Sequence, residues 1–373
     1  MNTAIVVGGG IIGASTAYSL ARGGVETLLI DREDDGRATA AGAGIISPPT
    51  SSRTADDTWF TFAIEAVEYY SELIDRLESA GYETGYASRG LLAVAADDDE
   101  IASFEEAIER IDDRQERLGV PAPGSIEQLS TASARDRFPP LAETHRAFFY
   151  DGGARVDGRL LTRALRRAGT DLGLETVSAS AEHIDPDPEV EVETADGERY
   201  QADAVVIAGG AWSATFGDQL GIEIPVEPER GQIIHLDCEY ETADWPVVKG
   251  FRGHYIVPWA DGRVAFGATR ESDAGFDSEP TAGGIHEVLE EGLRIAPGLA
   301  DAHLKEIRVG LRPTSADRLP ILGMPAEIEN VYLATGHGAT GLQLGPYSGK
   351  CIADLVQGNE PEAEILPFSP DRF

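Results

Sequence analysis

The sequence predicts an α/β fold: a Rossmann-like dinucleotide-binding domain, built from discontinuous segments, joined to an antiparallel-sheet α+β domain. Three observations predict this fold. The chain opens with a strand, a glycine-rich turn, a helix and a second strand. Another glycine-ended buried strand lies at residues 202–212, and residues 223–270 are rich in strands. Parallel α/β elements are therefore expected on both sides of β-rich material.

The opening βαβ unit is predicted from the pattern of apolar residues. Residues 3–7 are expected to form a buried strand, 11–23 a helix and 26–31 a second strand. The turn between the first strand and the helix contains the spacing G-x-G-x-x-G, formed by Gly8, Gly10 and Gly13. This spacing in this context is typical of a dinucleotide site.

Each glycine of this motif has a physical role. Gly8 permits a tight turn, Gly10 lets the backbone approach a pyrophosphate, and Gly13 lets the helix pack closely on the strand. The helix N-terminus offers free N–H groups to the anion. Asp31, 18 residues after Gly13, would accept hydrogen bonds from ribose hydroxyls and repel a 2′-phosphate. The motif therefore disfavours NADP and leaves NAD and FAD open.

The other elements follow from periodicity and turn signals. The turn "ADGR" joins two strands into a hairpin within the β-rich region. Parallel α/β elements are expected at 1–50, 150–215 and 305–373. Helices are expected over the apolar stripe from Trp59 to Leu77, over 101–111, 154–173, 284–296 and 344–358, and strands over 89–96, 307–313 and 330–338.

Two domains follow from this order of elements. Segments 1–85, 145–218 and 305–373 are predicted to form the dinucleotide-binding domain. Segments 86–144 and 219–304 are predicted to form the substrate-binding domain. A chain of 373 residues is long enough to bury two such cores.

The chain is strongly acidic, with a formal net charge of −35 from 65 acidic and 30 basic side chains. Its acids are spread along the chain, and 42% of its residues are hydrophobic, which is typical of a globular protein with an acidic surface. Such a surface repels nucleic acid and anionic membranes. It serves solubility in general, and we favour the narrower interpretation of adaptation to a high-salt, haloarchaeal-type cytoplasm.

The cysteines point to a reducing compartment, and the hydropathy pattern gives no sign of a membrane span. Cys238 and Cys351 are far apart and form neither a disulfide framework nor a metal-ligand spacing, so no metal is expected. No run of 18 apolar residues predicts a membrane span, and the apolar start lacks the basic region of a signal peptide. A cytoplasmic location is therefore expected.

The choice between NAD and FAD comes from a resemblance that covers almost the whole chain. Glycine-rich turns recur at 42–44, 209–210 and 336–345, and the last lies directly before the final helix. The chain resembles the D-amino acid oxidase superfamily of FAD-dependent oxidoreductases, and most of all its glycine oxidase branch and D-amino acid dehydrogenase relatives. The matching blocks, in order, are "VVGGGIIGASTAYSLARGG", "AGAGIISP", "VVIAGGAWS", "ERGQIIHL", "YIVP…GRVAFGAT", "VGLRPTSADRLPILG" and "LATGHGATGLQLGPYSGKCIADLV".

The resemblance implies a noncovalent FAD. Its ADP half would lie on the glycine motif and the end of the second strand, its adenine opposite Ala181, and its flavin beside residues 43–45 and under the loop at 336–343. A helix N-terminus there would stabilise the negative charge of the reduced flavin. The implied cofactor contacts are Gly8, Gly10, Ile11, Ile12, Gly13, Asp31, Arg32, Ala43, Gly44, Ile45, Ala181, Ala208, Gly209, Trp212, Arg312, Gly336, His337, Gly338, Ala339, Thr340, Gly341 and Leu342.

Two residues are expected to act on the substrate. Arg312 matches the family's carboxylate-binding arginine, and a guanidinium is the strongest partner for a carboxylate. Tyr255 matches a tyrosine that helps to bind the carboxylate or lines the pocket. The alternatives are an arginine paired with one of the many acids and a half-buried strand tyrosine. His254 should face the opposite side of the strand from Tyr255, and His337 is interpreted as a cofactor contact.

Two departures from the family pattern bear on the identity of the substrate and of the electron acceptor. Glycine oxidases tend to carry an arginine after the "GH" pair, where this chain reads "GHGATG". Sarcosine-oxidase-like relatives place an oxygen-activating lysine in a strand where Ala265 stands here. The second departure slightly favours a dehydrogenase or a slow oxidase.

The implied reaction is oxidation of the C–N bond of an amino acid or secondary amine of the glycine, sarcosine or D-amino acid class. Hydride would pass to flavin N5, and the imine would hydrolyse to a keto acid. The electron acceptor would be oxygen, a quinone or an electron carrier, and homo-oligomers are compatible with the sequence. The alternatives are a flavin subunit of a larger amine dehydrogenase or electron-transfer complex, and a nucleotide-binding module without catalysis.

Overall fold

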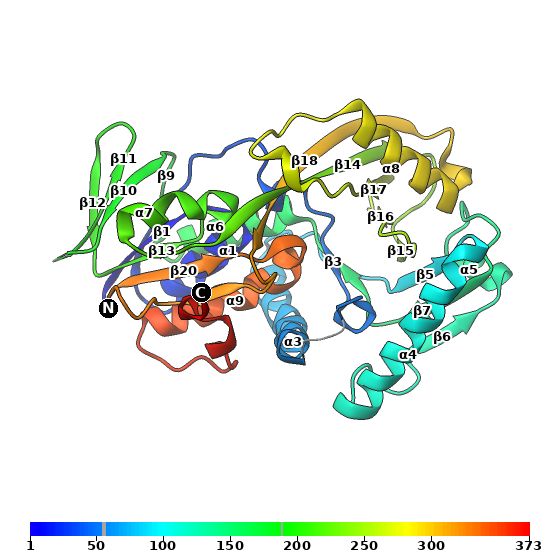
Figure 1. The fold of residues 1–373 in the computed structure, drawn as a ribbon, viewed down its shortest axis with the longest axis horizontal. Helices are drawn as coiled ribbons and strands as arrows, with labels where there is room; N and C mark the ends of the chain where they lie inside the picture. Colours follow the sequence, from blue (N-terminus) through cyan, green and yellow to red (C-terminus); the bar gives the residue numbers. More distant parts are fainter. Residues whose placement is uncertain (54–56, 188) are drawn as a thin grey trace.

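The computed structural model describes residues 1–53, 57–187 and 189–373, and its ribbon has two halves, each built on one large sheet (Figure 1). The half that holds both termini contains a six-stranded sheet with the order β19-β20-β13-β1-β2-β9. Five strands run parallel and β19 is antiparallel at one edge. The strands are β1 (Thr3–Val7), β2 (Glu26–Ile30), β9 (Glu175–Val177), β13 (Ala204–Ile207), β19 (Ile321–Gly323) and β20 (Val331–Thr335).

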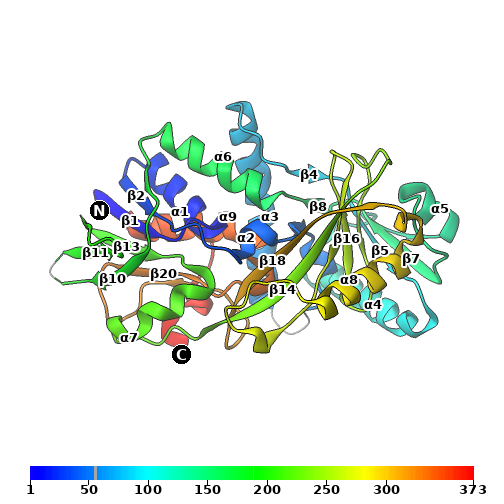
Figure 2. The ribbon, with the colours of Figure 1, turned by 90° about the horizontal axis from the view of Figure 1, so that it is seen from above.

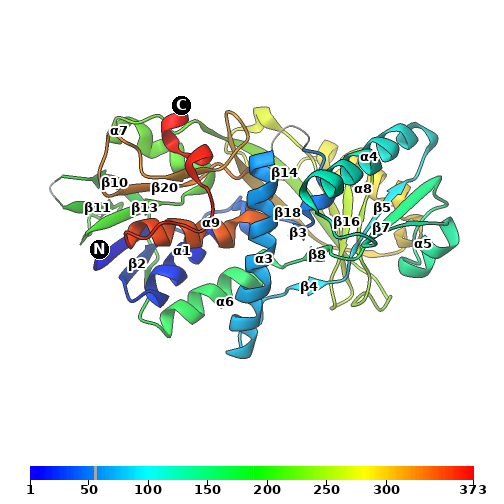
Figure 3. The same ribbon diagram turned by 90° about the horizontal axis from the view of Figure 1, so that it is seen from below.

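Both faces of this sheet are covered, which explains why its strands are apolar throughout. In β1, Ala4 and Val6 belong to the core on the face covered by helices, whereas Ile5 and Val7 belong to the core on the other face. Figure 3 shows α1, α6 and α9 side by side, with α3 crossing them. The covering elements are α1 (Ile11–Arg22), α3 (Asp57–Ser79), α6 (Gly158–Thr170) and α9 (Gly341–Val356) on one face, and α7 (Gly217–Leu220), β10 (Ala181–Asp185), β11 (Val190–Thr194) and β12 (Arg199–Ala202) on the other.

The other half contains an eight-stranded sheet with the order β18-β14-β17-β16-β15-β5-β7-β6. Its neighbouring strands are antiparallel except for β5 and β15. Helices α5 and α8 pack on one face and α4 on the other. The elements are β5 (Leu91–Ala95), β6 (Ile126–Leu129), β7 (Arg146–Tyr150), β14 (Val226–Asp237), β15 (Val247–Lys249), β16 (Tyr255–Pro258), β17 (Arg263–Gly267), β18 (His303–Ser315), α4 (Ile101–Leu118), α5 (Thr131–Arg137) and α8 (Ala282–Ile295).

Strands β14 and β18 form a long ladder that reaches from one half into the other (Figure 2). The pairing runs from Val226 opposite Ser315 to Asp237 opposite His303. Val226 belongs to a core of the six-stranded sheet, whereas Ile234 belongs to the core of the eight-stranded one. Between the halves lie a short helix and a small sheet: α2 (Ala38–Ala41), β3 (Ile45–Ile46), β4 (Ala87–Ser88) and β8 (Ala154–Arg155).

The predicted elements are present, with three differences. The helix expected from residue 154 begins at Gly158, because the Asp157 side chain accepts hydrogen bonds from two backbone N–H groups and caps it there. The strand expected over 202–212 is shorter, since β13 covers only Ala204–Ile207 and a 3-10 helix follows over Gly210–Phe216. The third difference is that β18 lies in the antiparallel sheet, although it was expected among the parallel elements of 305–373.

The proposed domain boundaries stay a prediction. Strand β7 and most of β18 are hydrogen-bonded within the eight-stranded sheet, although the boundaries at 145 and 305 assign them to the other domain. Among the described residues, no helix is both long enough and apolar enough to cross a bilayer.

Candidate active site

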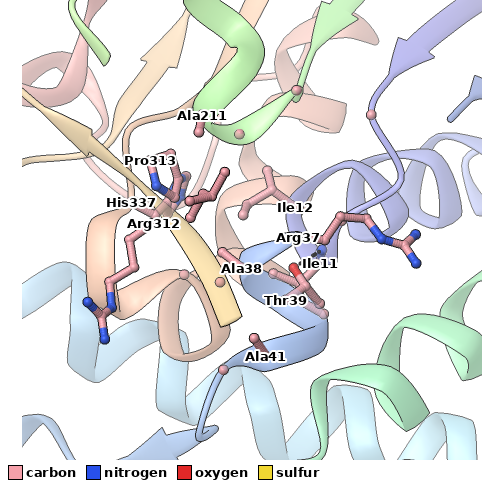
Figure 4. Close-up of a pocket in the computed structure, with 18 of the residues that line it drawn as sticks. Ile11, Ile12, Arg37, Ala38, Thr39, Ala41, Ala211, Arg312, Pro313 and His337 are labelled. Atoms are coloured by element: carbon pink, nitrogen blue, oxygen red, sulfur yellow. Dashed lines mark hydrogen bonds between the residues drawn. The ribbon is translucent and has the colours of Figure 1, made fainter. Parts of the chain in front are cut away.

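A pocket lies where the carboxyl ends of β1, β2 and β13 approach β14 and β18. In open α/β sheets this edge is where ligands bind. Figure 4 shows the small side chains of Ala38 and Ala41 between Arg37 on one side and Arg312 on the other. One pocket therefore extends from the glycine turn to the antiparallel sheet.

The glycine turn between β1 and α1 is shaped by contacts that exclude a side chain. A Cβ on Gly13 would stand 1.8 Å from the carbonyl oxygen of Gly8, and a Cβ on Gly8 would stand 2.5 Å from that of Ala208. The N-cap residue of helix α1 is Gly10, which has no side chain to cap it, and the first turn contains no acid. The Ile11 N–H donates to the Thr39 hydroxyl at 3.0 Å. The helix N-terminus thus presents partial positive charge to the pocket.

The end of the pocket beside β2 carries a buried carboxylate and an arginine that lies over a tryptophan ring. The Asp31 carboxylate lies against Gly9, whose Cβ would stand 2.5 Å from Oδ2. The Arg37 Nη1 atom lies 3.5 Å from the same Oδ2 atom. The Arg32 guanidinium lies over the Trp212 ring, 5.5 Å from its centroid. This end therefore combines a hydrogen-bond acceptor with a flat aromatic surface.

The loop before α9 and its first turn line the pocket beneath β18. The N-cap residue of α9, Thr340, makes no side-chain cap and no acid lies in the first turn, so the positive end of the helix dipole lies at the pocket. His337 Nε2 lies 2.9 Å from the Ser348 hydroxyl. Burial lowers the pKa of His337 to about 4, so the ring is neutral at pH 7. The positive potential here comes from the helix and not from the histidine.

Arg312 and Tyr255 meet at the other end, on β18 and β16. The Arg312 Nη1 group donates to Glu229 Oε1 at 2.9 Å and to the Thr269 carbonyl at 3.1 Å, and a side-chain hydrogen bond also links Arg312 to Tyr255. Burial raises the pKa of Tyr255, while the charges of Arg312 and Arg270 act to lower it. Tyr255 is therefore a protonated hydroxyl hydrogen-bonded to a buried guanidinium.

Two glycines make room for these side chains. A Cβ on Gly231 would stand 2.3 Å from Arg312 Nη2, and a Cβ on Gly267 would stand 2.5 Å from the Tyr255 ring. Any larger residue at either position would displace the side chain opposite. The positions of Arg312 and Tyr255 are thus set by strands β14 and β17.

The structure brings most of the expected site residues into one pocket. Gly13, Gly336 and Thr340 do not line it; Gly13 serves instead the close contact of α1 with the turn. The expected residues that line the pocket are Gly8, Gly10, Ile11, Ile12, Asp31, Arg32, Ala43, Gly44, Ile45, Ala181, Ala208, Gly209, Trp212, Tyr255, Arg312, His337, Gly338, Ala339, Gly341 and Leu342.

Several lining residues were missed. Thr39 lies just before the glycine turn at 42–44, a position at which a hydroxyl facing the motif could have been suspected. Arg270 follows directly after "VAFGAT", a block that carried part of the family resemblance without suggesting a role for the residue after it. Gly231 and Gly310 carry no signal in a single sequence, because their importance lies in contacts between strands.

Comparison with known proteins identifies the family. The family model described as "FAD dependent oxidoreductase" (DAO) matches residues 3–355. The chain belongs to the DAO family of FAD-dependent oxidoreductases. It is 38% identical over 374 residues to an uncharacterized oxidoreductase, YurR, of Bacillus subtilis, with 99% of each chain covered. It is 32% identical over 377 residues to the glycine oxidase of Pseudomonas putida, with 98% of each covered.

A solved structure supports the same assignment for the fold. The iminodiacetate oxidase IdaA from Chelativorans sp. BNC1 superposes with a TM-score of 0.93 at 38% identity, covering 98% of each chain. Membership of the DAO family confirms FAD as the cofactor, so NAD is excluded.

The pocket fits FAD on its own geometry. Two uncapped helix N-termini face it, and its glycine turn has a backbone surface that a Cβ would fill. Neither cysteine is a lining residue, in keeping with noncovalent attachment.

Proposed function

We propose that this DAO-family enzyme oxidises the C–N bond of a small amino acid or secondary amine that carries a carboxylate next to the nitrogen. The observation that carries the proposal is the meeting of Arg312 and Tyr255 in the same pocket as the α9 N-terminus. The relatives named glycine oxidase and iminodiacetate oxidase support a substrate of this chemistry. Glycine, sarcosine and D-amino acids are members of the class.

Each residue has a definable task. Arg312 binds the carboxylate through the donors that Glu229 leaves free, and Tyr255 donates its hydroxyl to the same group. Bound in this way, the substrate holds the C–H bond next to nitrogen in one orientation, which lowers the entropic cost of reaction. Bound FAD would supply the hydride acceptor, and the N-terminus of α9 would stabilise the negative charge that develops there. Water then hydrolyses the free imine.

The same geometry supports roles for the other pocket residues. We assign the glycine turn and the α1 N-terminus to the pyrophosphate, and Asp31 to the adenosine ribose. The segments 43–45 and 337–342 would then lie along the flavin. Hydrogen bonding by Asp31 would require its carboxylate to exchange part of its contact with Arg37 for the ribose hydroxyls.

Anaerobic mixing tests the proposed reaction. The purified protein is expected to be yellow, and its flavin absorbance is expected to bleach with at least one of glycine, sarcosine or a D-amino acid. A peroxide assay in air then shows whether oxygen or another compound is the electron acceptor. A yellow protein whose absorbance none of these compounds changes would contradict the proposed substrate class.

We also propose that the enzyme works in a salt-rich cytoplasm. The support is the charge of −35 and the presence of only three lysines, together with two free cysteines. Screening acts over about 3 Å at 1 M salt but about 10 Å at 0.1 M, so repulsion among surface carboxylates grows on dilution. Dialysis from molar to low salt is expected to lower the melting temperature and the activity. An unchanged melting curve would contradict the adaptation.

A further inference from the structure

The segment that connects β17 to α8 reaches from the antiparallel half to the half that holds both termini. We call residues 271–278 of this segment the strap; a short 3-10 helix, Ser272–Ala274, lies within it. At the tip of the strap, the Phe276 ring lies against the Trp212 ring, with the two centroids 5.5 Å apart. Trp212 lines the FAD pocket, whereas Phe276 does not. The strap therefore contacts the wall of the cofactor pocket from outside.

The strap crosses between two segments that line the FAD pocket. One is the 3-10 helix Gly210–Phe216, which carries Trp212, and the other is the loop after β2. On the side of the loop, a Cβ on Gly36 would stand 2.9 Å from the Cβ of Ser278 in the strap. The Arg32 guanidinium from the same loop lies over the Trp212 ring, 5.5 Å from its centroid. The strap thus closes the gap between these segments at the end of the pocket assigned to the adenosine.

Both ends of the strap are fixed to β14. The Arg230 side chain, which is 8% exposed, donates to Glu271 Oε2 at 2.6 Å and to Asp277 Oδ2 at 2.6 Å. The backbones of Arg230 and Glu271 also exchange two hydrogen bonds of 3.0 Å. Gln232 donates to Glu271 Oε1 at 2.7 Å. Because these bonds hold the ends, movement of the strap is confined to the residues between them.

The tip of the strap is only lightly held. Phe276 is 49% exposed and, among the described residues, is not a member of any of the hydrophobic cores. A segment with few buried apolar contacts opens at a lower free-energy cost than the core does. The contact of Phe276 with Trp212 is therefore the interaction that opening of the tip would have to break.

Gly275 directs the Phe276 ring toward Trp212. Its φ of +56° and ψ of −136° form a backbone conformation that residues with a side chain rarely adopt. A Cβ on Gly275 would meet nothing within 4 Å, so the requirement for glycine comes from the backbone and not from neighbouring atoms. The position of the ring thus depends on this one residue of the tip.

We propose that the strap is a gate for FAD, in which Phe276 must leave Trp212 before the cofactor can enter or leave its pocket. Arg230 keeps both ends of the strap on β14 while the tip moves. The gate concerns the cofactor, so it does not depend on which amine the enzyme oxidises.

A gate acts on rates and not on affinity. Phe276 does not line the pocket, so its ring stabilises the closed strap without contributing a contact to FAD. An interaction that is equally strong with and without a ligand cannot change the affinity for that ligand. Loss of the Phe276 ring is therefore expected to speed entry and release of FAD together and to leave its Kd almost unchanged.

Dilution of the FAD-loaded protein tests the gate. Flavin fluorescence is followed after dilution, so that its time course gives the release rate and its final level gives the Kd. Phe276→Ala is expected to speed release about tenfold, as loss of one aromatic pair and of the apolar area that it covers would. The final fluorescence level is expected to stay close to that of the wild type.

Two further variants separate the ring from the backbone that carries it. Phe276→Tyr keeps an aromatic ring at the tip and is expected to release FAD at the wild-type rate. Gly275→Ala keeps Phe276 but disfavours the positive φ, and it is expected to speed release. Release from Phe276→Tyr as fast as from Phe276→Ala would contradict the role of ring packing.

Tyr240 provides a matched control in the antiparallel half. It is 44% exposed, and its ring lies against the buried Trp245 ring with centroids 5.4 Å apart, away from the residues that line the FAD pocket. Tyr240→Ala is expected to release FAD at the wild-type rate, and an acceleration equal to that of Phe276→Ala would overturn the gate. So would an unchanged release rate in Phe276→Ala. A Kd that rises in proportion to the release rate would also overturn it, because Phe276 would then be a binding contact.

Discussion

Replacement of Arg312 by alanine is expected to raise the KM for the amine substrate about tenfold or more and to lower kcat as well. A charge-assisted hydrogen bond contributes roughly 1.5–3 kcal/mol, and each 1.4 kcal/mol corresponds to about a tenfold change in affinity. The effect on kcat arises because a carboxylate without its guanidinium no longer fixes the direction of the reacting C–H bond. Steady-state rates normalised to bound flavin measure both constants.

The ion pair with Glu229 makes a second variant informative. Arg312→Lys keeps a charge beside Glu229 but loses the planar donor arrangement, so it is expected to fall between wild type and Arg312→Ala. If Arg312 served only to neutralise Glu229, the lysine variant would have the KM of the wild type. That result, or an unchanged KM in Arg312→Ala, would remove Arg312 from the substrate site.

Replacement of Gly13 by alanine is expected to abolish FAD binding in purified protein. The new Cβ would stand 1.8 Å from the Gly8 carbonyl oxygen and 3.2 Å from the Ala208 Cβ, and the first of these contacts is with backbone. The contact can be relieved only if α1 moves away from the turn, which withdraws its N-terminus from the pyrophosphate. The ratio of flavin to protein absorbance reads out the cofactor content.

Gly283 provides the matched control, since a Cβ there meets nothing within 4 Å and the residue lies in the first turn of α8. Gly283→Ala is expected to keep full FAD content and a melting temperature equal to or above that of the wild type. Full FAD content in Gly13→Ala would contradict the role given to this close contact.

Local patterns predicted the elements well because short-range chemistry determines them. The opening βαβ unit needs only an apolar strand, glycines at the turn and helix-forming residues after it, and the structure reproduces its bounds within one residue. Local patterns do not determine which strand a given strand pairs with. β18 was expected in the parallel region, but it pairs with β14, a segment more than 60 residues earlier in the chain. Periodicity reports which side of a strand is buried and carries no information about its neighbour.

The candidate site was predictable to the extent that its residues act through their own chemistry or a known motif. Arg312 and Tyr255 were named from the family pattern, and the structure places both in the pocket. Arg270 was not named, because an arginine after a strand is ordinary in a sequence, and only its shared contact with Glu229 distinguishes it. The two alternatives for Arg312, binding of a substrate carboxylate or pairing with an acid, do not exclude each other, since Arg312 pairs with Glu229 and also lines the pocket.

The hollows left by Gly231 and Gly267 have a consequence for engineering the enzyme's selectivity. Because neither glycine has a side chain, the Arg312 and Tyr255 side chains can occupy the space beside them. A library that varies the lining residues but leaves Arg312, Tyr255 and these two glycines unchanged would therefore keep the geometry of carboxylate recognition. Uncharged substitutions of Gly231 in β14 or Gly267 in β17 would instead move the Arg312 guanidinium or the Tyr255 phenol without altering the charge of the pocket. The positions of the two binding groups and the charge of the pocket can therefore be changed separately.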